Sequence, residues 1–203
     1  MIYLEDLLEA PNFTLETGRI AAGFRAAHEL PPLYQLGVVV KDIESCAARL
    51  EARGLRPFFI AQGTAAAWAE REMTGKPTAR LGMGFHHGVQ IELIEPVDNA
   101  FFYTSSLDDQ GRMSVHHIGF LVRDVDAWAH SFEQKGLPTW VRGTIRNLGL
   151  TIEFAYMDTV ADAGIIIEFI GVKCLGIPMP VPPAVYHALG GIERLIGVRC
   201  LKL

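Results

Sequence analysis

The chain has 203 residues, half of them hydrophobic and 20% charged, so it can bury a sizeable core and is not expected to be disordered. The net charge of −5 at pH 7 and the lack of a basic stripe argue against nucleic acid or an anionic membrane surface as a partner. The sequence contains no run of about 18 apolar residues, so it predicts no membrane-spanning helix.

Residues 1–32 precede the first regular pattern and form an N-terminal extension. Their start carries Glu5 and Asp6 and lacks the basic and then apolar segments of a secretory signal. The cysteines are odd in number and have no zinc-type spacing; they are Cys46, Cys174 and Cys200. We therefore expect reduced thiols and a cytoplasmic protein.

Residues 33–98 predict a first module of strand, helix and further strands. The apolar run 36–40 predicts the strand, and Asp42 stands where the N-cap of a helix belongs. Apolar residues then recur at the spacing of one helix face, namely Ile43, Cys46, Ala47 and Leu50. Gly54 is suited to end this helix in the left-handed region, and the last strand of the module covers 89–94.

After a linker over 99–113, residues 114–172 repeat the same pattern as a second module. Residues 35–53 align without a gap with 117–135, at an offset of 117 − 35 = 82. The pairs that match at this offset include Gly37 with Gly119 and Asp42 with Asp124. The last strands align at 168 − 92 = 76, so the second copy is six residues shorter in its middle loops, which absorb such changes easily.

Residues 173–203 form a C-terminal extension. Its proline-rich stretch, 178–183, predicts an extended linker, and a helix is predicted from Ala184 to about Ile196. The sequence leaves open whether the two terminal extensions pack on their own subunit or on a partner.

The internal repeat predicts an α+β fold. Each copy has a strand, a helix and then about three strands, so the chain contains two tandem βαβββ modules. Helices would cover one face of each open sheet and leave the other face free. Two such sheets side by side are expected to form a curved mixed sheet around a shared cleft.

Four polar residues occupy equivalent places in the two copies. Because side chains alternate along a strand, Gln35 and His117 each point away from the module helix. Glu92 and Glu168 stand in the two last strands, and a carboxylate between Ile167 and Phe169 is costly to bury unless it is paired or bound to a metal.

The sequence therefore predicts one shared divalent-metal site formed by Gln35, Glu92, His117 and Glu168. One imidazole, one amide and two carboxylates suit Zn, Ni, Co, Mn, Mg or Fe(II), and the sequence does not choose among them.

Four segments resemble the vicinal oxygen chelate superfamily, which includes glyoxalase I: QLGVVVKDIE, VQIELIEP, HHIGFLVRDVD and FAYMDT…GIIIEFI. The resemblance covers about residues 33 to 172. It implies paired βαβββ modules that hold a metal through the first and last strand of each module. Glutamine at the first position, Gln35, is the pattern of one branch of glyoxalase I. Methylmalonyl-CoA epimerases are also similar, but their second ligand is usually glutamine, so Glu92 departs from them.

These features predict a metal-dependent lyase, isomerase or epimerase that acts by proton transfer on a small substrate chelated through adjacent oxygens. We expect Glu168 to be the base and Glu92 to lie on the opposite side of the substrate. The substrate is expected to have an apolar part, and the assembly is expected to be a homodimer.

Two other functions remain open. An extradiol-type dioxygenase of the same superfamily would use two histidines and one carboxylate, and Gln35 replaces one of those histidines. A metal-free protein that binds hydrophobic drugs would need apolar walls and no ligand set. A glyoxalase I would also need a cation for the carboxylates of glutathione, and the sequence offers Arg71, Arg142 and Arg146 without preferring one.

Several other residues have less specific roles at this level. His116 is expected to face away from His117, as packing or support, and His86 and His87 are expected at a turn too far away to bind the same metal. Tyr156 could face the cleft. Loop residues that could line a substrate pocket, or simply pack, are Trp68, Arg71, Phe101, Phe102 and Tyr103.

Overall fold

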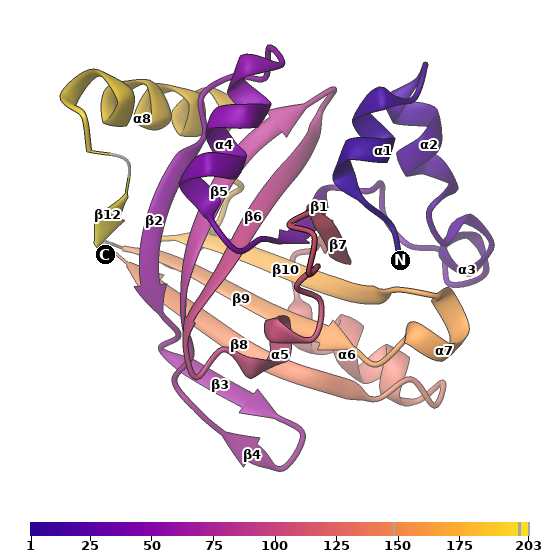
Figure 1. Cartoon of the computed structure of the whole chain (residues 1–203). Helices are drawn as coiled ribbons and strands as arrows, with labels where there is room; N and C mark the ends of the chain where they lie inside the picture. The colour runs from indigo at the N-terminus through magenta and orange to yellow at the C-terminus, as the bar shows by residue number, and fades with distance from the viewer. Residues whose placement is uncertain (148, 199, 203) are drawn as a thin grey trace.

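The computed structural model describes residues 1–203 except 148, 199 and 203. Its strands join in one mixed sheet in the order β12-β2-β5-β6-β1-β7-β10-β9-β8-β3-β4, with β11 paired to β10 (Figure 1). The strands are β1 Gln35–Val39, β2 Phe59–Thr64, β3 Ala67–Glu70, β4 Met73–Thr74, β5 Thr78–His86, β6 Val89–Asp98, β7 Ser114–Leu121, β8 Thr139–Asn147, β9 Leu150–Met157, β10 Ile166–Cys174, β11 Ile177–Pro178 and β12 Leu201–Lys202. The helices are α1 Leu4–Glu9, α2 Phe13–Arg19, α3 Ala22–Ala27, α4 Ile43–Ala52, α5 Phe101–Thr104, α6 Val125–Glu133, α7 Val160–Ala163 and α8 Pro183–Ile196.

The predicted α+β repeat is confirmed in the sheet. The first copy runs β1-α4-β2-β5-β6 with the small hairpin β3-β4 inserted, and the second runs β7-α6-β8-β9-β10. In each copy the first and last strands pair in parallel, β1 with β6 and β7 with β10. The copies meet where β1 and β7 pair antiparallel, with Gln35 opposite Gly119 and Gly37 opposite His117. Because 35 + 82 = 117 and 37 + 82 = 119, this pairing has the two-fold symmetry of the repeat.

The two module helices begin and end as the sequence predicts. Asp42 accepts a hydrogen bond from the backbone N–H of Ser45, and Asp124 accepts one from Ala127. Each helix is followed by a glycine at positive φ, +93° at Gly54 and +81° at Gly136, where a side chain would be strained.

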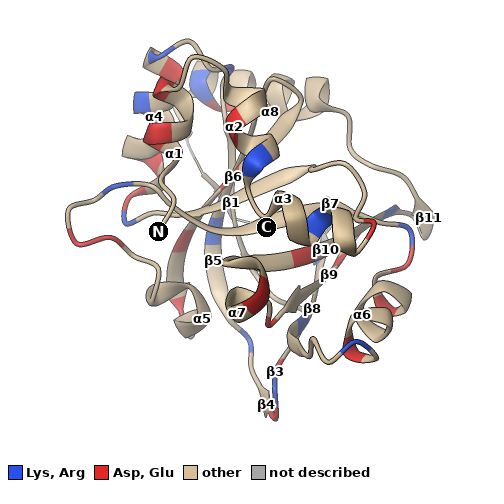
Figure 2. Cartoon of the chain, turned by 90° about the vertical axis from the view of Figure 1, so that its right-hand side faces the viewer, with Lys and Arg blue, Asp and Glu red and all other residues tan. Residues whose placement is uncertain are grey.

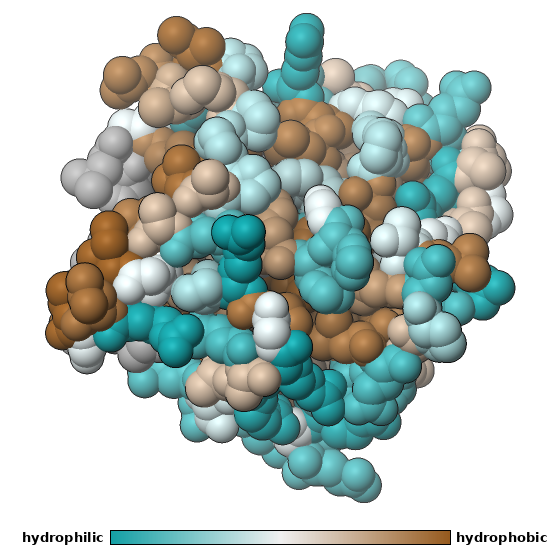
Figure 3. All heavy atoms as spheres, turned by 90° about the horizontal axis from the view of Figure 1, so that it is seen from above, coloured by the Kyte–Doolittle hydropathy of each residue, from teal (hydrophilic) through white to brown (hydrophobic). Residues whose placement is uncertain are grey.

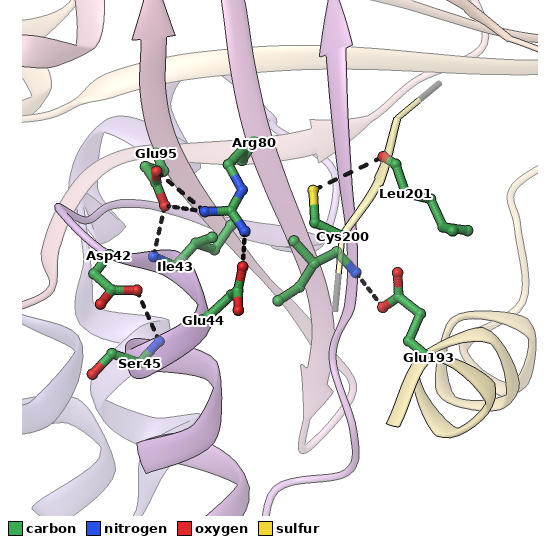
Figure 4. Close-up of polar contacts among 10 residues, drawn as sticks. Asp42, Ile43, Glu44, Ser45, Arg80, Glu95, Glu193, Cys200 and Leu201 are labelled. Atoms are coloured by element: carbon green, nitrogen blue, oxygen red, sulfur yellow. Dashed lines mark hydrogen bonds and ion pairs between the residues drawn. The ribbon is translucent and has the colours of Figure 1, made fainter. Parts of the chain in front are cut away.

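Charged side chains also fasten α4 to the sheet (Figure 4). Glu95 of β6 accepts the backbone N–H of Ile43 at 2.8 Å, so a strand carboxylate satisfies a donor in the first turn of the helix. Arg80 of β5 forms ion pairs with both Glu95 and Glu44 of α4. The helix is therefore held at its N-terminal end from two neighbouring strands.

Two apolar clusters occupy the two faces of the sheet. The larger joins the inner faces of α4 and α6 to the helix-facing side chains of the central strands, such as Leu36, Val38 and Ile118. The second contains side chains of the opposite parity, including Val39, Ile94 and Tyr156. The second face is the concave face of the curved sheet, and it carries the four predicted ligands.

The N-terminal extension packs on its own chain. The backbone N–H of Leu4 donates to Met113, and Val115 donates to Ile2, so the extension joins the start of β7. Phe24 of α3 makes an edge contact with Phe132 of α6 at a ring distance of 6.1 Å. The N-terminal helices therefore pack on the helix-bearing side of the sheet, with α3 beside α6 and α1 beside the end of α4, where Arg53 pairs with Glu9.

The C-terminal extension also packs on its own chain, against the first copy. The helix α8 lies against β2 and β5, and β12 pairs in parallel with β2. Glu193 of α8 accepts the backbone N–H of Ile60 at 2.9 Å (Figure 4). The helix approaches so closely that a Cβ at Gly190 would lie 2.5 Å from the backbone oxygen of Phe58.

Figure 2 shows basic and acidic residues intermixed along the helices and loops of the side in view. Among the helices of the described residues, none has both the length and the apolar character needed to cross a membrane.

Candidate metal centre

Strand register places the four predicted ligands around the junction of the two copies. Glu92 lies beside Gly37 on the neighbouring strand, and Glu168 lies beside Gly119. Across the junction, His117 is opposite Gly37 and Gln35 is opposite Gly119. Each ligand therefore stands next to a glycine, and the two glycines are equivalent positions of the repeat.

The glycines supply the space that the ligands occupy. A Cβ built on Gly37 would lie 1.8 Å from Cε1 of His117, inside the imidazole ring. A Cβ on Gly119 would lie 2.8 Å from Oε1 of Gln35. Neither glycine has a positive φ, so backbone conformation does not require glycine here. The close approach of the opposite side chain does require it, because a Cβ would occupy the same space.

Three of the four side chains form one compact group of donor atoms. The Nε2 atom of His117 is 3.0 Å from Oε2 of Glu168 and 3.8 Å from Oε2 of Glu92. One ligand atom from each of the three lies within 4.8 Å of the others. Within the described chain, this cluster brings imidazole and carboxylate donors close enough to share one ion.

Buried atoms without hydrogen-bond partners lie on the same set of residues. They include Oε1 of Gln35, Nε2 of His117 and Oε2 of Glu168. The Gln35 and Glu168 residues are each 4% exposed, and His117 is fully buried. Because a buried acceptor without a donor is costly, converging orphaned acceptors fit a bound cation better than a metal-free core.

The neighbouring histidine fixes the tautomer of His117. The Nδ1 atoms of His116 and His117 are 3.0 Å apart. His116 also hydrogen-bonds to the backbone of Phe102 in a way that favours its protonated form, so it acts there as the donor. Its Nδ1 is then the acceptor for Nδ1–H of His117, which leaves Nε2 of His117 as a lone pair turned toward the carboxylates.

His116 corrects one sequence-based expectation. Simple alternation predicts that it faces away from His117, but a register shift in the β1–β7 pairing places Gly37 opposite His117 and Val38 opposite Val115. The intervening residue is therefore a β-bulge, and both imidazoles contact Tyr156. The supporting role expected of His116 is consistent with this contact.

The first ligand is oriented by a residue that sequence reasoning left without a role. Nε2 of Gln35 donates to Oε1 of Gln90 at 2.8 Å, so the carbonyl oxygen of Gln35 is the free end of its amide. Gln90 is 3% exposed and lies on β6 two residues before Glu92. This shared strand face is the signal from which its role could have been inferred.

Burial and mutual repulsion strongly perturb the protonation of the site. Desolvation raises the pKa of Glu168 to about 8, against a hydrogen bond from Tyr156 that lowers it. Desolvation, followed by the charge of Glu168, raises the pKa of Glu92 well above its usual range. Desolvation lowers the pKa of His117 to about 3, so its imidazole is neutral near pH 7. A cation would favour the ionised form of both carboxylates.

Two phenols complete the polar wall of the site. The hydroxyls of Tyr103 and Tyr156 are 3.1 Å apart, and both side chains are buried. Desolvation is the main reason that their pKa values lie well above the usual range, so both hydroxyls stay protonated. Tyr156 faces the cleft as the sequence allowed, and Tyr103 reaches it from α5 in the segment between the modules.

The donor cluster opens into a cavity of about 330 Å³, which is the size of a small-ligand site. Its walls come from both copies and from α8. Beside the proposed ligands, the lining contains the polar side chains Gln90, Tyr103 and Tyr156, and most of the remaining lining side chains are apolar. The lining residues are Tyr34, Gln35, Phe59, Ala61, Gly63, Thr64, Leu81, Met83, Gln90, Glu92, Tyr103, Ile145, Arg146, Leu150, Ile152, Phe154, Tyr156, Glu168, Ile170, Val172, Val181, Val185, Tyr186 and Leu189.

The other candidate residues lie elsewhere or pack behind the site. Arg71 pairs with Asp158, and Arg142 pairs with Asp126, so among the three arginines only Arg146 lines the cavity. Trp68 and Phe102 pack against each other in the second apolar cluster, and neither lines the cavity.

Residues 34–156, more than half of the chain, match the sequence profile of the Glyoxalase/Bleomycin resistance protein/Dioxygenase superfamily. The chain belongs to this superfamily. No curated protein matches it.

Solved structures share the fold of this superfamily member at low sequence identity. A variant of Streptomyces coelicolor methylmalonyl-CoA epimerase in complex with 2-nitronate-propionyl-CoA superposes with a TM-score of 0.51 at 22% identity, over 74% of this chain and 99% of that one. A mutant of 4-hydroxymandelate synthase from the same organism gives 0.51 at 16% identity, over 82% and 56%. An epimerase and a synthase on one fold show that the fold does not select the reaction.

Proposed function

We propose that this protein is a divalent-metal-dependent isomerase or lyase that moves a proton on a small substrate bound through two adjacent oxygens. The observation that supports the proposal is the cluster of Glu92, His117 and Glu168, in which His117 Nε2 and Glu168 Oε2 are buried without a partner. The unpartnered Oε1 of Gln35 lies beside it, opposite Gly119 on the neighbouring strand. A neutral imidazole, an amide oxygen and two carboxylates form an N/O donor set that suits a hard or borderline divalent ion.

Gln35, Glu92, His117 and Glu168 would hold the ion. When bound, a divalent ion supplies a Lewis acid that withdraws negative charge from substrate oxygens. The chain supplies the surroundings: the buried site excludes water, and the His116–His117 hydrogen bond keeps a lone pair on Nε2.

Glu168 is the proposed base. Burial raises the pKa of its carboxyl to about 8 in the metal-free site, and a bound ion would lower it, so these two opposing effects would set its strength as a base. The Tyr156 hydroxyl holds the carboxylate in place through a hydrogen bond. Glu168 would take a proton from a carbon next to the chelated oxygens, and return of that proton to a neighbouring atom would complete an isomerisation. Glu92, on the strand of the other copy, would receive or return a proton on the opposite side.

A dioxygenase is the second candidate within this superfamily. Oxygenases of the iron type use two histidines and a carboxylate with open positions. The cluster in the described chain contains one histidine and two glutamates, and His116 directs its Nδ1 to His117 rather than toward Glu92 and Glu168. The donor set therefore supports proton transfer over oxygen chemistry.

Metal content tests the proposal. We expect about one divalent ion per chain in wild type purified without chelators, measured by elemental analysis. His117→Ala should lose it, since the substitution removes the only imidazole of the group. His130→Ala, an exposed histidine on α6, is the matched control and should keep the wild-type content.

The opposite result also has a clear meaning. Wild-type protein that takes up no divalent ion, even after reloading with each candidate metal, would contradict the proposal. Tight binding of a hydrophobic compound by such metal-free protein would instead identify a small-molecule binding protein of the same fold.

A further inference from the structure

We propose that α8 is the roof of the substrate site and that it selects a substrate whose chelating end is attached to an uncharged, apolar body. This inference rests on the proposed function, because the metal would hold the chelating end. The helix lies outside residues 34–156, so the specificity comes from a segment beyond the family match.

The first reason is that α8 is fixed in place over the cavity. Its Glu193 carboxylate is 2% exposed and accepts the backbone N–H of Ile60 on β2. Gly190 lets the helix approach the backbone of Phe58 closely, and β12 continues the anchor by pairing with β2. The helix α8 is therefore held firmly against the first copy.

The second reason is that α8 contacts Gln90, the residue that orients the proposed ligand Gln35. The hydroxyl of Tyr186 hydrogen-bonds to the side chain of Gln90, which is the acceptor for Nε2 of Gln35. Burial raises the pKa of Tyr186 to about 12, so the hydroxyl is protonated under ordinary conditions. One line of contacts thus runs from the roof to the proposed first ligand.

The third reason is the chemistry of the cavity walls. Apart from the proposed ligands Glu92 and Glu168, Arg146 is the only charged residue among the described residues of the lining. The roof contributes Val185, Tyr186 and Leu189, Val181 lies in the segment just before it, and the other walls are mainly aliphatic and aromatic side chains. A volume of about 330 Å³ lies at the small end of ligand sites, which fits a single ring or a short branched chain.

Hydrophobic residues are concentrated on α8 and are also found on its outer, exposed side. Figure 3 shows hydrophobic side chains along the side of the molecule where Figure 1 places α8. Leu195 is 87% exposed and does not line the cavity, whereas Leu189, on the same helix, is 36% exposed and lines it. The same substitution at these two leucines therefore separates the effect of the roof from the effect of changing the helix.

The test uses two hydroxamates, which chelate a metal through adjacent oxygens. Acetohydroxamate and benzohydroxamate differ in the apolar body, and their affinities for metal-loaded protein are measured by titration calorimetry. Burial of the phenyl ring should make benzohydroxamate bind roughly 10- to 50-fold more tightly than acetohydroxamate. Leu189→Asp should reduce this ratio to about 1–3, whereas Leu195→Asp should keep the wild-type ratio.

The outcomes separate this inference from the proposed function. Equal affinities for the two hydroxamates in metal-loaded wild type would overturn the apolar-body inference while leaving the metal site intact. A wild-type ratio retained in Leu189→Asp would overturn the role of the roof. Leu189→Ala, which adds no charge, should give an intermediate ratio and covers the case in which the aspartate variant does not fold. Absence of bound metal in wild type would remove the proposed function and this inference together.

Discussion

The two copies of the repeat share a framework and differ in what surrounds their ligands. In the first copy, the proposed ligand Gln35 is oriented by Gln90, and this pair lies under α8. In the second copy, the position equivalent to Gln90 is Ile166, and the proposed ligand His117 is oriented instead by His116 from a bulge in its own strand. Duplication thus explains the framework, whereas the chemistry comes from residues that differ between the copies.

The same contrast holds for the two carboxylates. Glu168 receives a hydrogen bond from Tyr156 and lies 3.0 Å from Nε2 of His117. Glu92 is 3.8 Å from that nitrogen, and its side chain is 15% exposed. The second copy therefore holds its carboxylate in a more defined position than the first copy holds Glu92.

The largest effect is expected from breaking the symmetric junction. Gly37→Ala places a methyl group within the space of the His117 ring, so it should destabilise the fold by about 3 kcal/mol and abolish metal binding. Gly119→Ala meets two side-chain ends, Oε1 of Gln35 and Cδ1 of Ile170, each at 2.8 Å, and should cost only about 1 kcal/mol because both can move aside. Chemical denaturation and metal titration measure both effects.

Gly18→Ala is the control for this pair, because a Cβ there meets no atom within 4 Å. The variant should be as stable as wild type and bind metal normally. If Gly37→Ala bound metal with wild-type affinity, the close approach of His117 to Gly37 would not be a feature of the working site.

The protonation of the site predicts an unusual pH dependence for metal-free protein. A carboxyl whose folded-state pKa is raised contributes stability below its unfolded pKa, and this contribution is lost as pH rises through the folded value. Above about pH 6.5 the buried histidines are neutral in the folded state and mostly neutral in the unfolded state, so Glu168 and Glu92 dominate. The melting temperature of metal-free protein should therefore fall between pH 6.5 and 8.5.

Excess divalent metal should remove this fall, because the ion stabilises the ionised carboxylates. Differential scanning calorimetry with and without chelator measures it. Glu168→Gln has no carboxyl to titrate and should show a shallower pH dependence without metal. A melting temperature that rises through this range in metal-free wild type would contradict the account of the two buried carboxyls.

The smallest effect is expected from the residue that orients the first ligand. Gln90→Leu removes the acceptor for the Gln35 amide and the partner of Tyr186, so metal affinity should fall by about 10-fold. Gln110→Leu is the control, because Gln110 is exposed and lies in the segment between the modules. Unchanged metal affinity in Gln90→Leu would show that Gln35 does not depend on this support.

Much of the framework could be predicted from the sequence. Strand and helix spacing, the caps at Asp42 and Asp124, and the glycines after both helices are local features, and the repeat related the two copies without any contact information. The repeat also indicated that Gln35, Glu92, His117 and Glu168 would meet, because equivalent strand positions in two adjoining sheets face one cleft.

The rest depends on features that have no local signature. The bulge at His116 breaks the alternation on which the sequence-based expectation relied. The place of Tyr103 depends on how the segment between the modules folds back against β6, and the roof formed by α8 depends on contacts with residues more than one hundred positions away. Such long-range packing is set by the whole fold and cannot be inferred from spacing alone.

Deuterium exchange measured by NMR tests directly whether Glu168 removes a proton from a metal-chelated substrate. The probe is 2-hydroxyacetophenone, which has adjacent oxygens, an acidic C–H and an apolar ring. Metal-loaded wild type in D2O should exchange that C–H faster than buffer with the same metal, and Glu168→Gln should lower the rate by at least about 100-fold while keeping its fold. Exchange in metal-loaded Glu168→Gln at the wild-type rate, or exchange by wild type no faster than by the free ion, would contradict the account.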